Sequence, residues 1–252
     1  MAKAKNQTTQ GVKRMVRVHS KRYGNHERNP RGTFKPAVLN EVMEQSKNRL
    51  LQVNQTASLI FNSIRDEHND GTLWTRLLSV LRRQLKENNN NDVHCLLNLE
   101  CHAVHTLKNL LRSNWYNITA EIVKRQLAIT LSLDNGPRWK TKNMHQFQAS
   151  MYVIYPDLAR NRIQKEVIYS EVYSIVAFPE ELSFVVPIPP DAPAYAVFLK
   201  VTGCSDGVPQ NGLQSTGMRC VAVGIIPGKQ RPPAKRKTAT KRKQPNARKR
   251  IT

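Results

Sequence analysis

The sequence predicts an α+β protein in which an N-terminal helical hairpin precedes an antiparallel β-sandwich of jelly-roll-like type, with disordered basic termini. Three observations lead to this prediction. Residues 37–86 repeat apolar side chains at three- and four-residue steps, which is typical of amphipathic helices. Residues 116–226 contain seven short segments rich in Val, Ile, Thr, Tyr and Phe, with turn residues between them. The two ends of the chain hold almost all of its net positive charge.

The basic charge divides the 252 residues into a nearly neutral core and two cationic arms. Lys and Arg number 40 against 18 Asp and Glu. Residues 1–36 hold ten of these bases and one acid, whereas residues 227–252 hold eleven bases and no acid. The 190 residues between them carry a net charge of +2. Because like charges repel and the C-terminal arm has little to bury, we expect that arm to be disordered when free.

The arms are the predicted nucleic-acid contact. Flexible Lys and Arg side chains neutralise backbone phosphates of DNA or RNA without reading bases, since they have no fixed base-edge geometry. The candidate binding residues are Lys13, Arg14, Arg17, Lys21, Arg22, Lys229, Arg231, Lys235, Arg236, Lys237, Lys241, Arg242, Lys243, Arg248, Lys249 and Arg250.

The N-terminal segment 13–23 is open to two interpretations. Met15, Val16 and Val18 alternate with basic residues, which permits either a cationic arm or a short strand docked on the edge of the core. The domains predicted from these patterns are a basic arm (1–36), a helical hairpin (37–92), a β-sandwich (93–226) and a basic tail (227–252).

Two amphipathic helices account for the predicted hairpin. The first follows Pro36, which suits a first helical turn, and Asn69-Asp70-Gly71 ends its pattern. Thr72 can cap the second helix, which places a Trp and several Leu on one face. The opposite face is either an ordinary solvated surface or a second phosphate contact, through Arg76, Arg82, Arg83 and Lys86.

The predicted strands follow a loop of consecutive Asn residues. They are Tyr116–Val123, Leu127–Leu133, Gln148–Tyr155, Glu166–Ala177, Glu181–Ile188, Ala194–Thr202 and Met218–Ile226. Short strands without intervening helices are typical of an antiparallel sandwich or jelly roll. Residues 93–112 fit both a strand and a helix.

Three segments follow the same plan as a known group of proteins. They are FKPAVLNEVMEQSKNRLLQVNQTASLIF, LWTRLLSVLRRQL and LSFVVPIPPDAPAYAVFLKVTG. The chain resembles uncharacterised bacterial proteins of similar length, in which a basic stretch and two amphipathic helices precede a C-terminal antiparallel β-sandwich. The resemblance covers about residues 37–225 and lies in the order of elements. It implies the fold and no activity, and the basic C-terminal arm departs from that group.

The sequence offers little for catalysis. It contains no phosphate-binding loop, dinucleotide fingerprint or nucleophile elbow. Cys95, Cys101, His102 and His105 form its densest group of metal-ligand types, but their spacing does not match a zinc knuckle. We therefore expect no enzyme, no catalytic residue, no metal and no cofactor. Trp139 lies among Arg and Lys residues, and it either stacks on a base or covers one end of the sandwich.

The predicted function is that of a structural nucleic-acid-binding protein whose core self-associates. In composition and arm placement the chain resembles viral coat proteins with basic arms. The alternatives are a ribonucleoprotein or chromosome component, and a protein-binding module with basic targeting tails. No apolar run is long enough for a membrane span or a secretory signal, so we expect no membrane partner. The expected location is a virion, the cytoplasm or nucleoid, or the nucleus of a eukaryotic host.

Overall fold

The structure is a computed structural model that describes residues 16–20, 24–28, 40–88, 92–139, 143–210 and 212–227. The chain forms two compact units, residues 1–48 and 49–252. In the first unit, strand β1 (Val16–Ser20) pairs antiparallel with β2 (Gly24–Arg28). A strand therefore forms within segment 13–23, and its partner among the described residues is β2. The predicted disorder of the termini concerns residues that lie outside this description.

Helix α1 (Glu41–Ile64) begins after Asn40, whose side-chain Oδ1 accepts a hydrogen bond from Met43 N at 2.8 Å. This is the geometry of a helix N-cap. The C-terminal half of α1 buries four apolar residues, Val53, Ala57, Ile60 and Ile64. Val42 and Met43, which belong to the same predicted stripe, are 70% and 53% exposed. No apolar residue lies between Met43 and Leu50, so the apolar stripe of α1 has a gap. The buried residues of the helix all follow this gap.

Helix α2 (Leu73–Asn88) begins after Thr72, as predicted. The Thr72 carbonyl accepts from Arg76 N at 3.0 Å. Its side chain differs from the predicted cap, because Thr72 Oγ1 donates to Asp70 Oδ1 at 2.8 Å. Asp70 Oδ1 also accepts from Thr72 N at 2.9 Å, so the aspartate organises the turn before the helix.

All seven predicted strands form, and all their pairings are antiparallel. One sheet has the order β10-β8-β5-β6, with β9 paired to β8, and the other has the order β3-β4-β7. The strands are β3 (Tyr116–Val123), β4 (Gln126–Leu133), β5 (Gln146–Asp157), β6 (Arg162–Ser174), β7 (Glu181–Pro187), β8 (Ala194–Ser205), β9 (Val208–Pro209) and β10 (Thr216–Ile225). The mixed helix-and-sheet class with antiparallel strands is thus confirmed.

The ambiguous segment 93–112 is neither one strand nor one helix. It contains a 3-10 turn, η1 (Val93–Leu96), and a single turn of helix, α3 (Leu107–Leu110). Between them Glu100 forms an isolated antiparallel bridge with Arg219 of β10. Side-chain caps start both short elements, since Asp92 accepts from His94 N and Thr106 accepts from Asn109 N.

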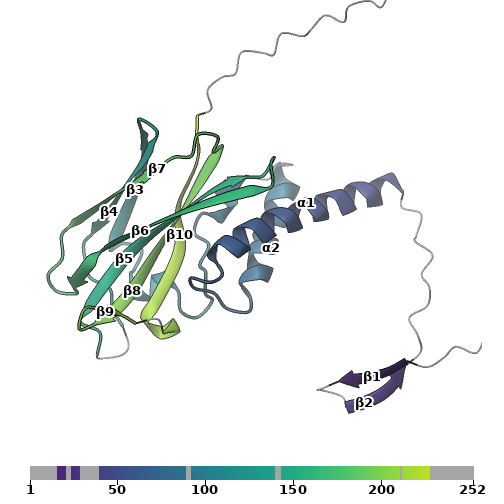
Figure 1. The fold of residues 1–252 in the computed structure, drawn as a ribbon, viewed down its shortest axis with the longest axis horizontal. Coiled ribbons are helices and arrows are strands. Elements are labelled where there is room, and N and C mark those ends of the chain that lie inside the picture. The colour runs from purple at the N-terminus through teal and green to yellow at the C-terminus, as the bar shows by residue number, and fades with distance from the viewer. Residues whose placement is uncertain are drawn as a thin grey trace, which may run out of the picture. The chain divides into compact units, whose positions relative to one another are not determined.

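The four-stranded path β10-β8-β5-β6 is covered on both faces (Figure 1). On β5 the alternate residues Met151 and Val153 pack toward β4 and β7, whereas Tyr152 and Ile154 pack toward the helices. β10 lies beside β3, and β6 beside β7, at the two margins, which curls the strands into a half-barrel. The sheet therefore separates two apolar cores.

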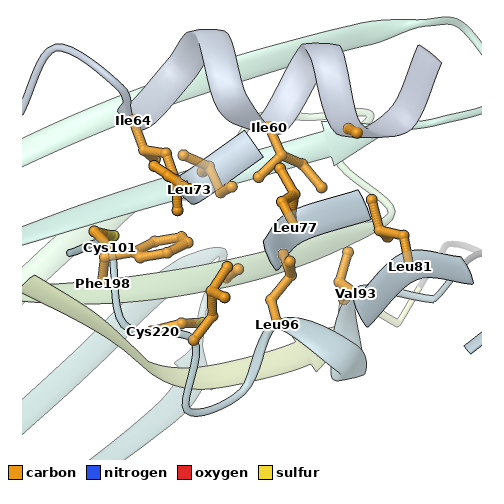
Figure 2. Packing of buried hydrophobic residues seen from close by; sticks show 14 of the residues in the cluster. Ile60, Ile64, Leu73, Leu77, Leu81, Val93, Leu96, Cys101, Phe198 and Cys220 are labelled. Carbon is orange, nitrogen blue, oxygen red and sulfur yellow. The ribbon is translucent and has the colours of Figure 1, made fainter. Parts of the chain in front are cut away.

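The helix-side core lies between α1, α2, η1 and the sheet. Figure 2 shows Ile60, Leu77 and Leu96 converging from three elements toward the strands that carry Phe198 and Cys220. Its buried members are Val53, Ala57, Ile60, Ile64, Leu73, Leu77, Leu81, Leu85, Val93, Leu96, Leu99, Cys101, Tyr152, Ile154, Ala196, Phe198, Met218 and Cys220.

The sheet-side core lies between the two sheets and under α3. Its buried members are Leu107, Leu111, Leu127, Ile129, Leu131, Leu133, Phe147, Ala149, Met151, Val153, Tyr155, Leu182, Phe184, Val186, Tyr195, Val197, Leu199 and Val201. Gly217 of β10 is needed here, because a Cβ at this position would lie 2.8 Å from Leu107 Cα. The glycine lets α3 rest directly on the strand.

Candidate nucleic-acid interface

The predicted contact residues are concentrated in the arms, and the structure describes one of them. Arg17 lies on β1, and its side chain is exposed. The other fifteen candidates, in residues 13–22 and 229–250, lie outside the described residues. Their role in binding stays a prediction.

The polar face of α2 divides into two kinds of residue. Arg76 is held inside the protein, since it donates to Asp70 Oδ1 and to Cys101 O at 3.2 Å each, and also to Glu100 O. Its side chain is 28% exposed, so it is a structural residue and not a phosphate contact. Arg82, Arg83 and Lys86 are exposed and form no ion pair with any described residue. They remain available for a polyanion.

Asp70 is the centre of a polar junction between the turn 65–72 and the loop 100–106. Besides Thr72 and Arg76, it accepts a hydrogen bond from Ala103 N at 2.6 Å. Burial acts to raise the Asp70 pKa, but hydrogen bonds from Ala103, Thr72 and Arg76 outweigh it and hold the pKa well below its usual range. Asp70 is therefore a fixed negative charge that orders the loop.

Three histidines extend this junction. His68 Nε2 donates to His105 O at 2.8 Å, and His102 Nδ1 accepts from Val104 N and His105 N at 3.1 Å each. The His102 ring centroid lies 5.1 Å from that of His68 and 4.8 Å from that of His105. Burial lowers the pKa of both His68 and His102. Both are thus held neutral, and they support loop backbone groups.

The two cysteines of the predicted metal-ligand group lie in different surroundings. Cys95 Sγ donates to Asp92 O, and Cys101 is buried in the helix-side core. Burial raises the pKa of Cys95 to about 12 and that of Cys101 further. Within the described part of the chain, no three His, Cys, Asp or Glu side chains are placed to hold a metal ion.

A second group of polar side chains lies around Tyr152, on the helix-side face of β5, β6 and β8. Glu67 Oε1 accepts from Lys165 Nζ at 3.0 Å, and Glu67 Oε2 lies 3.4 Å from Lys200 Nζ. Burial acts to raise the Glu67 pKa, but hydrogen bonds from Tyr152 and Lys165 and the charge of Lys200 lower it overall. Both lysines also lie over the Tyr152 ring. Their charges are engaged inside the protein and are not free for a ligand.

Trp139 takes the second of its two predicted roles. Its Nε1 donates to Ser215 O at 3.0 Å, and its ring packs close to Gly203. The side chain is half-buried, so it covers one end of the strands and presents no free ring for a base.

Trp115 forms cation–π contacts with two arginines. It is 9% exposed, and the guanidinium Cζ atoms of Arg112 and Arg138 lie 5.1 Å and 4.7 Å from its ring centroid. Each such contact contributes about 0.5–1 kcal/mol at an exposed site. Neither arginine has a carboxylate within 4 Å among the residues that the structure describes. We call Arg112, Trp115 and Arg138 the arginine stack.

A pocket of about 230 Å³ adjoins the arginine stack. Its lining residues are Val104, His105, Thr106, Asn109, Leu110, Arg138, Gln214 and Thr216. Arg138 belongs to both features, and its backbone N donates to Leu110 O at 3.0 Å. The pocket therefore combines one cation, several neutral hydrogen-bonding groups and two apolar walls.

Sequence reasoning did not single out the arginine stack. Arg112 precedes Trp115 by three residues, which is a weak local signal. Arg138 reaches the ring from a separate loop through its bond to Leu110, and nothing in the local sequence predicts this. No protein-family model, curated protein or solved structure matches the chain. Among the described helices, none has the length and apolar character needed to cross a membrane.

Proposed function

We propose that the protein is a non-enzymatic structural nucleic-acid-binding protein, as in a viral or phage coat or packaging protein. Its arms neutralise phosphates and its core self-associates. The charge partition carries this proposal, because ends with net charges of +9 and +11 flank 190 residues with a net charge of +2. A cationic segment of this density releases counterions from nucleic acid, which drives sequence-independent binding.

The finer architecture that we propose is a helical hairpin followed by a jelly-roll-like sandwich. Two antiparallel sheets that share the sheet-side core support it, as do two helices that bury one face each in the helix-side core. Such a body would be the folded subunit of an assembly, and the arms would supply the phosphate contacts.

A groove of about 850 Å³ supports self-association through the core. Its lining combines Ile and Pro residues, among them Ile122, Ile188 and Ile225, with the charged residues Arg125, Asp157, Arg160 and Asp191. Ile225 is 64% exposed. Proline-rich turns keep the shape of such a surface fixed, and exposed apolar patches commonly mark protein contacts. We expect a second copy of the chain to bind here.

The arm hypothesis is tested in the full-length chain. Replacing the eleven Lys and Arg of residues 227–252 by Gln should flatten the dependence of duplex affinity on salt, since each phosphate contact contributes roughly 0.9 to the log–log slope. A matched control keeps all eleven charges but scrambles the order of the tail, and its slope should equal that of the parent. An unchanged slope after neutralisation would refute a role for this arm.

Light scattering with added polyanion tests the assembly. Neutralising the arms removes the repulsion between subunits, so we expect particles of a preferred size and crosslinks through the core. If the mass of the complexes grows only in proportion to polyanion length, a ribonucleoprotein or chromosome component is the better description.

A further inference from the structure

We infer that the arginine stack and its adjoining pocket bind one nucleotide of single-stranded nucleic acid. The phosphate would lie on the guanidinium groups and the base in the pocket. This inference rests on the proposed function, and it adds a site on the folded unit to the contacts proposed for the arms. Two observations carry it. The guanidiniums of Arg112 and Arg138 lie over the buried Trp115 ring without a carboxylate partner among the described residues, and Arg138 also lines the pocket.

The stack is fixed before any ligand binds. Trp115 N donates to Arg112 O at 2.9 Å, and Asp134 N donates to Trp115 O at 2.8 Å. The loop that carries Arg138 is held at Gly136, where the carbonyl of Ile175 leaves no room for a Cβ. These contacts hold the backbone that carries the stack, and both guanidiniums lie over the indole from exposed arginines. A planar guanidinium in this arrangement can donate to a phosphate and stack on a base.

The charges around the stack favour an anion. Lys108 lies in α3 close by in sequence and is exposed, with no ion-pair partner in the described part of the chain. The carboxylate nearest along the backbone belongs to Asp134, and it forms no ion pair with either arginine of the stack. Glu100 is engaged at the N–H groups of Leu107 and Lys108. A phosphate would therefore meet two free guanidiniums.

The pocket fits a base better than a second phosphate. Arg138 is the only Arg, Lys, Asp or Glu in its lining, and Val104 and Leu110 supply apolar walls. Asn109 Nδ2 is engaged with Val104 O at 2.8 Å, which leaves its carbonyl oxygen for a ligand. The Gln214 amide is exposed and forms no hydrogen bond with any described residue. An unpaired base offers the edges that such groups bind, whereas a base within a duplex does not.

The test compares two double variants of the full-length chain. R112Q/R138Q removes the stack, and K47Q/R49Q removes the same charge from two exposed residues of α1. The probes are a single-stranded oligothymidylate of about ten nucleotides, a duplex of equal length and inorganic polyphosphate. Circular dichroism confirms that each variant is folded.

We expect R112Q/R138Q to lose about tenfold in single-strand affinity, against about twofold or less for K47Q/R49Q. The log–log salt slope on the single strand should fall by roughly 1.4 for the first variant alone, since two phosphate contacts are lost. R112K/R138K keeps the charges and loses the planar groups, so it should retain the slope and lose affinity. N109A/Q214A should weaken single-strand binding and leave polyphosphate binding unchanged.

The possible failures are distinguishable. Equal losses in R112Q/R138Q and K47Q/R49Q would overturn the nucleotide site and leave the arm hypothesis intact. An equal loss of polyphosphate and single-strand affinity in R112Q/R138Q would overturn the base pocket. If the parent protein binds no nucleic acid at low salt, the proposed function fails, and this inference fails with it.

Discussion

The two faces of the sheet β10-β8-β5-β6 are built from alternate residues of the same strands, yet they are covered differently. The sheet-side face packs aliphatic and aromatic side chains against another regular sheet. The helix-side face packs an equally apolar set, but Asp70, Arg76 and His102 are held at its margin.

The difference follows from backbone hydrogen bonding. A strand satisfies its N–H and C=O groups in the ladder, so the face between two sheets needs no polar side chain. The loop 100–106 has no ladder beyond the bridge at Glu100, and side chains must satisfy its backbone. Asp70 accepts from Ala103 N, His102 accepts from two N–H groups, and Arg76 donates to two carbonyls. Irregular backbone therefore brings half-buried charge with it.

The largest effect should be common to both faces. Leu77→Ala on the helix side and Leu131→Ala on the sheet side each remove a fully buried side chain, and each should lower the free energy of unfolding by about 3–5 kcal/mol. Denaturant unfolding measures both. If one of the two variants loses less than about 1 kcal/mol, that face has collapsed around the cavity and the two cores differ in rigidity.

A second, smaller effect should be specific to the helix side. Asp70→Ala removes the acceptor of Ala103 N and one of several acceptors of Arg76, so we expect a loss of about 1–3 kcal/mol. The matched control is Asp66→Ala, whose carboxylate is 79% exposed and pairs with Arg65 at the surface. That control should change stability by less than about 0.5 kcal/mol. Similar losses in the two variants would contradict the role assigned to the junction.

Acid should destabilise the helix side first. The pKa values of His68 and His102 are lowered in the folded state, so the unfolded chain binds more protons than the folded chain. Stability is therefore complete above the ordinary histidine pKa of about 6.5 and falls as the pH drops below it. Protonation of His102 Nδ1 would also place a proton where Val104 N and His105 N donate. Urea unfolding across this pH range measures the fall.

The control for the acid effect is the exposed His145. His68→Gln should reduce the fall in stability, because its amide can still donate to His105 O without titrating. His145→Gln should leave the pH dependence unchanged. Protonation of carboxylates affects stability at lower pH than protonation of the histidines. The lowered pKa of Asp70 contributes stability that is lost only as the pH falls below about 4. A pH profile that His68→Gln leaves unaltered would refute the histidine assignment.

The smallest effect concerns the cap of α3. Thr106 Oγ1 accepts from Asn109 N at 3.2 Å, so Thr106→Ala should cost about 1 kcal/mol, and Thr106→Ser should restore most of it. Thermal unfolding resolves a change of this size. Because α3 rests on Gly217, the alanine variant should also perturb the pocket beside Arg138.

The sequence predicts regular elements better than the irregular ones between them. Leu127, Ile129, Leu131 and Leu133 alternate with polar residues and are buried as the alternation predicts. The segment 93–112 carries no single period, because its conformation depends on Glu100 bonding to α3 and on the bridge to β10. Such partners lie far along the chain and leave no local pattern.

The same reasoning explains the candidate site. The arms are evident from charge alone, since no folding is needed to place them at the ends of the chain. The arginine stack depends on Arg138 reaching Trp115 from another loop. Only the folded backbone brings these residues together, so composition and periodicity do not predict it.

Two buried thiols can report how often the helix-side core opens. Cys101 and Cys220 are fully enclosed in the helix-side core, and burial raises the pKa of both, so neither is a reactive thiolate in the closed protein. An alkylating reagent reaches them only when the elements around the helix-side core separate from the strands. Their labelling rate therefore measures how often that core opens.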